Sequence, residues 1–436
     1  MNILFVLHGF PPEVRGGGTE RSVEALTRAM VERGHRVTVL CGSLEVGSVD
    51  TVVETDYAGI RVLRVHRDDL YFESWFKTYH PGVSRTLLRV FRDERPDVVH
   101  VHHWLRLSSD VLRTAREAGL TAVATLHDYF TVLGRVVRRV GDDELEPPQL
   151  ARWTSEVEAR EEFAMHRRDF ADELAAAHLL FAPSRAHVEG LSELALGSLG
   201  AVEITPPPLL AVPAPLRHKP IKGGHRLVTW GSIYPDKGLE TVLDAMRAAG
   251  GDWSLQILGR IHDPDYEREL RNFAAGLPVT FSGAFHTDDL AAIEADYAVL
   301  PSLCCESYGL VLDEAQALGL PVIASDVPAY REHAQPGSCL FFPPGDAASL
   351  AVELVRGDEI AALVPPDRPA LETAAAVADT LLRHYEAIDA GKAPFRPDRT
   401  LERDRAEMLF RRAERRLWSA LNTSDLRLPP DDFLRG

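Results

Sequence analysis

The sequence predicts an α/β protein with two doubly wound domains that face each other across a cleft. Two series of short apolar runs alternate with amphipathic stretches, which is typical of strands followed by helices. Between the two series lies a proline-rich stretch, 205–224, that cannot continue a helix or a central strand. Such alternation favours parallel sheets covered on both faces, and ligands bind such sheets at the carboxyl ends of their strands.

Composition narrows the class of protein. At 436 residues the chain is too long for one ordinary core, and its net charge of −17 argues against non-specific nucleic-acid binding. The four cysteines lack metal-ligand spacing and predict a reducing cytosol. The apolar N-terminus is too short for a signal peptide, and no stretch approaches the roughly 20 apolar residues of a membrane span. We therefore expect a cytoplasmic protein without a transmembrane segment, and the excess of arginine over lysine indicates a GC-rich bacterial genome.

The first unit of the first series carries a glycine-rich loop. A strand at 2–7 is followed by three glycines at 16–18, a helix at 20–33 with Thr19 as its predicted N-cap, and a strand at 36–40. Glycine lets backbone approach a bulky ligand. The loop lacks the G-x-G-x-x-G spacing of a dinucleotide site, and an ordinary surface loop stays open as the alternative.

The remaining first-series elements bring histidines to strand ends. We expect strands at 60–66, 98–102, 121–126 and 178–183, and helices at 82–94, 107–117, 153–177 and 186–195. His100 and His102 share a strand face, which favours a polar strand end over a metal site because no carboxylate or cysteine lies nearby. His127 follows a strand, so it either faces the ligand or caps the next helix. The charged stretch 134–148 predicts an irregular loop near the acceptor.

The second series predicts a second sheet and two closing helices. Strands are expected at 227–231, 254–258, 279–281, 297–300, 322–325 and 338–342, and helices at 239–249, 266–275, 290–294 and 347–355. Helices at 370–388 and 400–421 follow. We therefore divide the chain into a first domain (1–204), a linker (205–224), a second domain (225–370) and C-terminal helices (371–436). These helices pack back on the first domain or, alternatively, on a partner.

The stretch 298–319 carries the main functional signal. Glu306 lies on the loop after a strand, and Glu314 lies seven intervening residues later, in a helix that begins near Leu310. The free N–H groups at the start of a helix, together with its dipole, are suited to a phosphate. Flanking carboxylates suit hydroxyl groups, so the stretch predicts a nucleotide-sugar site with one glutamate at the sugar and one at the ribose.

Lys237 is the candidate cation of this site. It follows the strand at 227–231 and precedes a helix, where it can neutralise a diphosphate. The alternative is a solvated surface lysine. The acidic pairs of the chain are explained by helix caps and turns, and no Walker loop is present. We therefore predict no catalytic metal and no cofactor besides the donor substrate.

Over residues 1–388 the chain resembles the retaining GT-B glycosyltransferases of family 4. The matching segments are PPEVRGGGTERSVEALTRAMVERGHRVTVL, PDVVHVHHW, TLHDYFTVL, DKGLETVLDAM and PSLCCESYGLVLDEAQALGLPVIASDVPAYREH. The resemblance implies that Glu306 lies near the donor sugar, Glu314 at the ribose and His127 at the sugar. It also implies that the amides of Leu310 and Val311 bind the phosphates, with Gly17 and Gly18 approaching from the opposite domain.

Two features depart from the family. Its usual Gly-Arg pair is Gly231-Ser232 here, so one of two cations is missing. Two alternatives stay open: donor affinity is weaker, or Arg260 or another arginine replaces the missing cation. Residues 390–436 extend beyond the usual family end. The candidate catalytic residues are Glu306, His127 and Lys237. The candidate donor-binding residues are Gly17, Gly18, Ser232, Arg260, Ser307, Tyr308, Gly309, Leu310, Val311 and Glu314.

The resemblance implies a retaining transferase that moves a sugar from a nucleoside diphosphate to a hydroxyl acceptor. The acceptor is expected to be a natural product or a saccharide. Because no nucleophile is placed, front-face displacement assisted by the leaving phosphate is implied by the family. Ser232 and the extra helix leave open a catalytically silent GT-B subunit that binds or activates a partner. A sugar phosphorylase would need a pyridoxal-bearing lysine, for which Lys237 is the one well-placed candidate.

Overall fold

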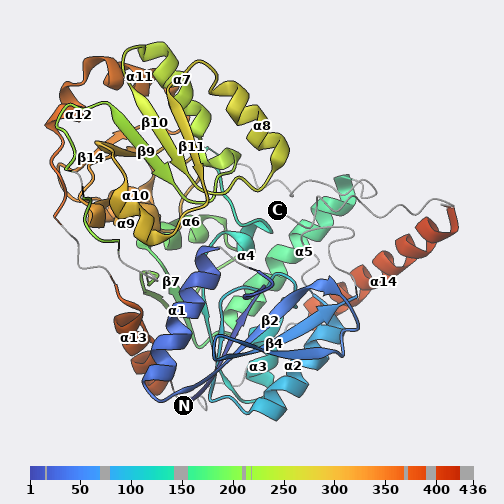
Figure 1. The fold of residues 1–436 in the computed structure, drawn as a ribbon. Helices are drawn as coiled ribbons and strands as arrows, with labels where there is room; N and C mark the ends of the chain where they lie inside the picture. The colour runs from blue at the N-terminus through green and yellow to red at the C-terminus, as the bar shows by residue number, and fades with distance from the viewer. Residues whose placement is uncertain are drawn as a thin grey trace.

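The protein folds into two α/β lobes, which the computed structural model shows stacked one above the other (Figure 1). The structure describes residues 1–14, 17–68, 79–141, 156–208, 213–217, 219–367, 372–388 and 399–422. Each lobe is built on one sheet, and the two sheets contain the two predicted series of strands. The two-domain α/β prediction is therefore confirmed.

The sheet of the first lobe has the strand order β3-β4-β2-β1-β5-β6-β7-β8. Its strands are β1 (Asn2–Leu7), β2 (Arg36–Val46), β3 (Val52–Tyr57), β4 (Ile60–Arg67), β5 (Val98–Val101), β6 (Thr121–Thr125), β7 (Leu179–Ala182) and β8 (Val202–Ile204). Strand β3 pairs antiparallel with β4, and the other pairings are parallel. The central strands β1 and β5 are buried except at Asn2, the first residue of β1, because helices cover both faces, as their continuous apolar runs predicted.

The helices of this lobe form two cores, one on each face of the sheet. They are α1 (Gly18–Glu32), α2 (Pro81–Glu94), α3 (Val111–Glu117), α4 (Phe130–Leu133), α5 (Glu156–Ala175) and α6 (Arg185–Leu194). Helix α1 packs its buried Val23, Leu26 and Met30 on β1 and β2. The loop after β1 therefore leads directly into a helix whose N-terminus lies at the carboxyl edge of the sheet.

The second lobe has a fully parallel sheet of order β11-β10-β9-β12-β13-β14. Its strands are β9 (Arg226–Trp230), β10 (Ser254–Leu258), β11 (Val279–Gly283), β12 (Tyr297–Leu300), β13 (Val322–Ser325) and β14 (Cys339–Phe342). Its helices are α7 (Leu239–Ala249), α8 (Pro264–Phe273), α9 (Leu310–Leu318), α10 (Pro328–His333), α11 (Ala347–Arg356) and α12 (Asp358–Ala362), with the 3₁₀ helices η1 (Pro235–Lys237) and η2 (Thr287–Ala292). Strands β9 and β12 lie at the centre, so the loops after them meet.

Several local predictions were wrong, each for a physical reason. Helix α1 begins at Gly18 with Gly17 at the N-cap position, so Thr19 lies inside the first turn. Strands β3 and β8 were missed because these edge strands are short and half-exposed, which leaves no apolar pattern. The segment predicted as helix from residue 107 is helical only from Val111. The element expected at 290–294 is the 3₁₀ helix η2, and the short helices α4 and α10 were not predicted.

The chain returns to the first lobe at its C-terminal end. Helix α13 (Ala374–Ala387) buries Val377, Leu381 and Tyr385 in the core beneath α1 and β1, and it lies beside α1 in Figure 1. The Tyr385 hydroxyl lies 2.5 Å from Nδ1 of His100. The boundaries 1–204, 205–224, 225–370 and 371–436 remain our proposed division, because 209–212, 218 and 368–371 lie outside the described residues.

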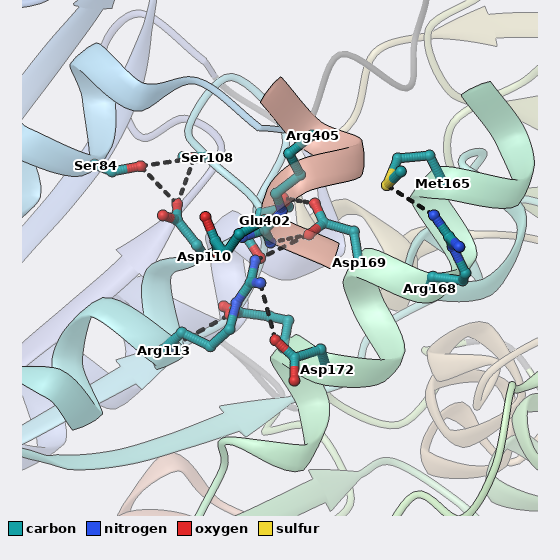
Figure 2. Close-up of polar contacts among 12 residues, drawn as sticks. Ser84, Ser108, Asp110, Arg113, Met165, Arg168, Asp169, Asp172, Glu402 and Arg405 are labelled. Atoms are coloured by element: carbon teal, nitrogen blue, oxygen red, sulfur yellow. Dashed lines mark hydrogen bonds and ion pairs between the residues drawn. The ribbon is translucent and has the colours of Figure 1, made fainter. Parts of the chain in front are cut away.

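Helix α14 (Arg399–Asn422) docks on α5 through buried charges, which Figure 2 shows in close-up. Asp169 on α5 accepts hydrogen bonds from Arg405 on α14, from Arg113 (3.0 Å) and from the Ser109 hydroxyl. Arg405 and Asp169 are each about 2% exposed. A second pair, Arg168 with Asp404, lies nearer the surface at 2.5 Å. Among the described residues, no helix has the length and apolar character needed to cross a membrane.

Candidate functional site

A cleft of about 580 Å³ lies between the two lobes, at the carboxyl ends of both sheets. Most predicted site residues line it, namely Gly17, Gly18, His127, Ser232, Lys237, Glu306, Ser307, Tyr308, Gly309, Leu310, Val311 and Glu314. Arg260 is the exception: its side chain is exposed and it is not among the lining residues. The fold therefore brings together residues from the loops after β1, β6, β9 and β12.

Lys237 and Glu306 form an ion pair at the floor of the cleft. The Lys237 ammonium lies 2.9 Å from Oε1 of Glu306, and the same oxygen accepts a hydrogen bond from Ser302 at 2.7 Å. The Tyr330 hydroxyl lies 3.5 Å from that oxygen. Because only one carboxylate oxygen is engaged by these groups, the other is available to a ligand hydroxyl.

Glycine at position 238 makes this pair possible. Gly238 has φ +68°, and a Cβ there would lie 2.1 Å from the carbonyl oxygen of Pro301. The backbone of η1 can therefore press against the end of β12 only with glycine. That close approach places Lys237, the last residue of η1, beside the loop that carries Glu306.

Both members of the pair are charged. Burial tends to raise the pKa of Glu306, but the Lys237 ammonium and the Ser302 hydroxyl outweigh it and hold that pKa below its usual range. Burial likewise opposes the charge on Lys237, but the Glu306 carboxylate holds the pKa of Lys237 well above its usual value. A carboxylate for hydroxyl groups and an ammonium for phosphate oxygens therefore lie side by side.

The loop after Glu306 presents a row of free amides. Among the described residues, no protein acceptor receives the N–H groups of residues 307–311. Gly309 has φ +90°, and a Cβ there would lie 2.3 Å from the Tyr330 ring, so only glycine fits at this N-cap of α9. Unpaired amides at a helix N-terminus form an anion site.

Glu314 lies one turn further along α9. Its Oε2 accepts a hydrogen bond of 2.6 Å from the Trp230 indole N–H, at the end of β9. Burial raises the pKa of Glu314 above its ordinary value. The two glutamates thus differ in environment, one held ionised by a lysine and the other beside a neutral indole.

The first lobe supplies a wall of histidines and carboxylates. His127 lies 3.0 Å from Nδ1 of His102, and burial lowers the pKa of His127 to about 4, so its imidazole is neutral near pH 7. His8 pairs with Glu20 at 2.9 Å, and Asp128 lies 3.3 Å from Nε2 of the His103 ring. This wall offers hydrogen-bonding groups for hydroxyls and contains two carboxylates.

Two long cationic side chains line the cleft within the described part of the chain, Lys237 and Arg21. Arg21 lies in the first turn of α1, on the lobe opposite Lys237, and its charge acts on Glu314 across the cleft. Ser232 is exposed at the cleft and brings no charge. Arg21 is therefore better placed than Arg260 to supply the second cation.

A short segment of the first lobe contacts the loop before Glu306. Cys305 N–H donates to the Arg138 carbonyl at 2.8 Å, and Val140 N–H donates to the Leu303 carbonyl at 2.8 Å. The Arg139 guanidinium pairs with Asp236 at 2.5 Å. We call residues 138–140 the strap. It lies within the stretch predicted as a loop near the acceptor, of which 142–148 fall outside the described residues.

Several site residues were not found from the sequence. Arg21, Glu20 and His8 adjoin predicted loops, and their position just beyond a strand end was a usable signal. Ser302 likewise follows β12. Tyr330 gave no local signal, because it reaches Glu306 only through the packing of α10 against α9.

Known proteins resemble both halves of the chain. Residues 16–196 match the family described as Glycosyltransferase Family 4, and residues 224–357 match the family described as Glycosyl transferases group 1. The chain is 30% identical over 337 residues to a D-inositol 3-phosphate glycosyltransferase of Jonesia denitrificans, covering 71% of this chain and 75% of that protein. A 135-residue stretch is 38% identical to a phosphatidyl-myo-inositol mannosyltransferase of Mycobacterium leprae, covering 28% of this chain but only 35% of that relative.

Solved structures also resemble the fold of this chain. The structure matches the Anabaena protein HepE, solved in complex with UDP and glucose, with a TM-score of 0.59 over 89% of this chain and 100% of HepE, at 17% sequence identity. That likeness establishes the two-lobed fold. Together with the sequence matches over both lobes, it shows that this chain is a GT-B glycosyltransferase and belongs to glycosyltransferase family 4.

Proposed function

We propose that this protein is a retaining glycosyltransferase that moves a sugar from a nucleoside diphosphate to a hydroxyl group of a natural product or a saccharide. One observation carries the proposal: the Lys237–Glu306 pair lies beside the free amides of residues 307–311, inside a cleft between two lobes. This arrangement offers an ammonium and amides to a diphosphate and a carboxylate to sugar hydroxyls.

The donor is proposed to lie along the second lobe. Its phosphates bind the free amides of Leu310 and Val311 and the Lys237 ammonium, and Glu314 receives the ribose hydroxyls. Glu306 accepts hydrogen bonds from the sugar. Across the cleft, Gly17 and Gly18 approach the diphosphate, and Arg21 supplies the cation that Ser232 does not.

The reaction is proposed to be a front-face displacement. The acceptor oxygen forms a bond to the anomeric carbon while the bond from that carbon to the phosphate oxygen breaks. The acceptor proton passes to the departing phosphate oxygen, so the products are the glycoside and the nucleoside diphosphate. Lys237 and the amides stabilise the charge that grows on the leaving group, and we assign no metal to this step.

The first-lobe wall is proposed to receive the acceptor. Because His127 is neutral, it serves as a hydrogen-bonding group toward the sugar and not as a cation. Glu20 and Asp128 lie on the same wall, and carboxylates favour an acceptor rich in hydroxyl groups over an acidic one. The relatives support a nucleotide-sugar donor: HepE was solved with UDP and glucose, and the Jonesia relative is a glycosyltransferase by name.

A donor panel tests the proposal. UDP-, GDP-, ADP- and dTDP-sugars are incubated with the protein, and melting temperature and release of nucleoside diphosphate are measured. We expect a donor with one particular base to raise the melting temperature. Its nucleoside diphosphate should be released at a rate that Glu306→Gln strongly lowers. Absence of both a shift and release with every donor would overturn the proposal. The anomeric configuration of the product, read by NMR, decides between retention and inversion.

A further inference from the structure

We propose that Ser184 and His333 are positioning residues. They hold the carbonyl oxygens of Ser307 and Tyr308, and so fix the peptide groups whose amides lead directly into the phosphate-binding amides of Leu310 and Val311. This inference rests on the proposed function, because it explains how the donor loop acquires its anion site. Neither residue touches the reacting atoms; each acts through the backbone of the loop.

Peptide geometry gives the reason. The peptide groups 307–308 and 308–309 are trans, so the C=O and N–H of each point in opposite directions across one plane. A hydrogen bond that fixes the carbonyl therefore fixes the direction of the amide. The carbonyls of Ser307 and Tyr308 both accept hydrogen bonds from protein side chains, whereas in the described chain the amides of Tyr308 and Gly309 donate to no protein group.

Ser184 holds the first of these peptide groups from the opposite lobe. Its hydroxyl donates to the Ser307 carbonyl at 2.6 Å and accepts the N–H of His187 at 3.0 Å, as the N-cap of α6. The residue is only 1% exposed. With donor and acceptor both engaged, the hydroxyl has a single orientation, and the peptide group that it holds has one as well.

His333 holds the second peptide group from α10. Its Nε2 lies 2.8 Å from the Tyr308 carbonyl, and its Nδ1 lies 2.8 Å from Oδ1 of Asp313. The Tyr308 hydroxyl donates to the other Asp313 oxygen at 2.8 Å, and the Tyr308 and His333 rings stack with centroids 4.4 Å apart. The side chain and the carbonyl of Tyr308 are therefore both fixed by the same His–Asp pair.

Glu332, next to His333 in the chain, links the hydrogen bonds that hold the donor loop to the docking of the two lobes. Its two carboxylate oxygens accept the N–H groups of Arg185 (3.1 Å) and Ala186 (2.9 Å), at the N-terminus of α6. This contact brings α10 of the second lobe against α6 of the first, and Ser184 reaches Ser307 at the same place. The direction of the Tyr308 amide thus depends on the lobes being docked.

Nucleotide-binding measurements distinguish a positioning role of Ser184 and His333 from a general effect on the stability of the protein. UDP, GDP, ADP and dTDP, and the corresponding free nucleosides, are titrated into wild type, Ser184→Ala and His333→Ala. We expect each variant to weaken nucleoside diphosphate binding about five- to tenfold, the effect of one misdirected hydrogen bond. Binding of the nucleoside, which lacks phosphate, should not change. Ser184→Thr, which keeps the hydroxyl, should restore diphosphate binding, and His333→Gln should restore it in part.

The matched control is Thr373→Ala, which removes the N-cap hydroxyl of α13, far from the donor loop in sequence and outside the cleft lining. It should lower stability as Ser184→Ala does and leave nucleotide binding unchanged. Equal diphosphate affinity in wild type and both alanine variants would overturn the inference while the proposed function stands, and so would an equal loss for the nucleoside. Failure of the wild type to bind any of the four diphosphates would instead overturn the proposed function, and the inference with it.

Discussion

At the scale of single residues, the site depends on the charge of one lysine. Lys237 compensates the buried carboxylate of Glu306 before the donor arrives, and in the proposed reaction it also faces the leaving diphosphate. The Lys237 side chain is 28% exposed and the Glu306 side chain 16% exposed, so neither charge is fully solvated. Removing the ammonium would therefore leave a half-buried carboxylate next to a phosphate.

Lys237→Met is expected to lower kcat by about 10²- to 10³-fold, the usual effect of losing one stabilising group at a developing negative charge. The pKa of Glu306 should rise, because burial is then no longer outweighed. Steady-state release of nucleoside diphosphate measures the first effect. Lys222→Met, at an exposed position, is the control and should retain activity; a similar loss in both variants would contradict the assigned role.

The two glycines that flank α9, Gly309 at its N-cap and Gly319 at its C-cap, give a second prediction. Gly309→Ala combines a backbone at φ +90° with a Cβ 2.3 Å from the Tyr330 ring, so the loop must move and diphosphate affinity should fall at least tenfold. Gly319→Ala, at the other end of the same helix, has φ +81° but no atom within 4 Å. It should cost about 1 to 2 kcal/mol of stability and leave binding intact. Calorimetric titration of both variants checks this contrast.

At the scale of elements, α9 and α10 are held together by a charged His–Asp contact. Burial lowers the pKa of His333, but the Asp313 carboxylate, the Tyr308 carbonyl and the charge of Glu332 outweigh burial and leave that pKa raised. The stability that this contact contributes is complete below the unfolded pKa of histidine. It is lost as pH rises through the raised pKa of the folded protein.

We expect the donor KM to rise as pH increases through the raised pKa of His333, above the ordinary histidine value of 6.5, because His333 then loses its proton and one of its two hydrogen bonds. Asp313→Asn should move this rise to lower pH, because it removes the neighbouring negative charge. His333→Gln, which does not titrate, should abolish this step in the profile. A donor KM that follows the same pH curve in all three proteins would rule out His333 as its origin.

Helices α5 and α14 are joined by a buried charge network, seen in Figure 2. Asp169 is shared by the guanidinium groups of Arg113 and Arg405. Asp169→Asn would remove the one carboxylate that both guanidinium groups share and leave buried Arg405 with the half-exposed Glu402 as its remaining ion-pair partner among the described residues. We expect it to lower the free energy of unfolding by about 3 kcal/mol. Asp404→Asn breaks the outer pair with Arg168, which is 47% exposed, and should cost less than about 1 kcal/mol. Urea unfolding of the two variants compares these costs.

At the scale of the whole molecule, the two lobes meet at the donor loop itself. The strap contacts residues 303–305, while Ser184 contacts Ser307, so the first lobe holds the loop on both sides of Glu306. Helix α13 follows the second lobe in the chain and packs in the core of the first lobe, beneath α1. Opening of the lobes would therefore free the donor loop from the first-lobe contacts on both sides of Glu306.

The double variant Arg139→Ala/Val140→Pro removes the ion pair to Asp236 and the N–H bonded to Leu303. We expect a larger radius of gyration in small-angle X-ray scattering and a lower kcat, with both lobes still folded by circular dichroism. Arg138→Gln is the control, since its partner Glu193 belongs to the same lobe. Unchanged scattering and kcat in the double variant would show that the strap does not set the arrangement of the lobes.

Local pattern determined much of this protein. The apolar runs predicted at 2–7, 254–258, 297–300 and 322–325 coincide with β1, β10, β12 and β13, because buried parallel strands need uninterrupted apolar sequence. The spacing of Glu306 and Glu314 was visible because both lie in one short stretch of sequence that spans the start of α9. Edge strands such as β3 escaped prediction because solvent on their exposed sides removes the pattern.

The tertiary structure alone decided which groups complete the site. Ser184 and Ser307 are 123 positions apart, and Arg21 and Glu314 face each other from different lobes. No local periodicity records such contacts, because they depend on how two separately folded lobes dock. Lys237, Glu306 and the free amides could thus be predicted from the local sequence. The direction of those amides and the second cation arise only when the lobes meet.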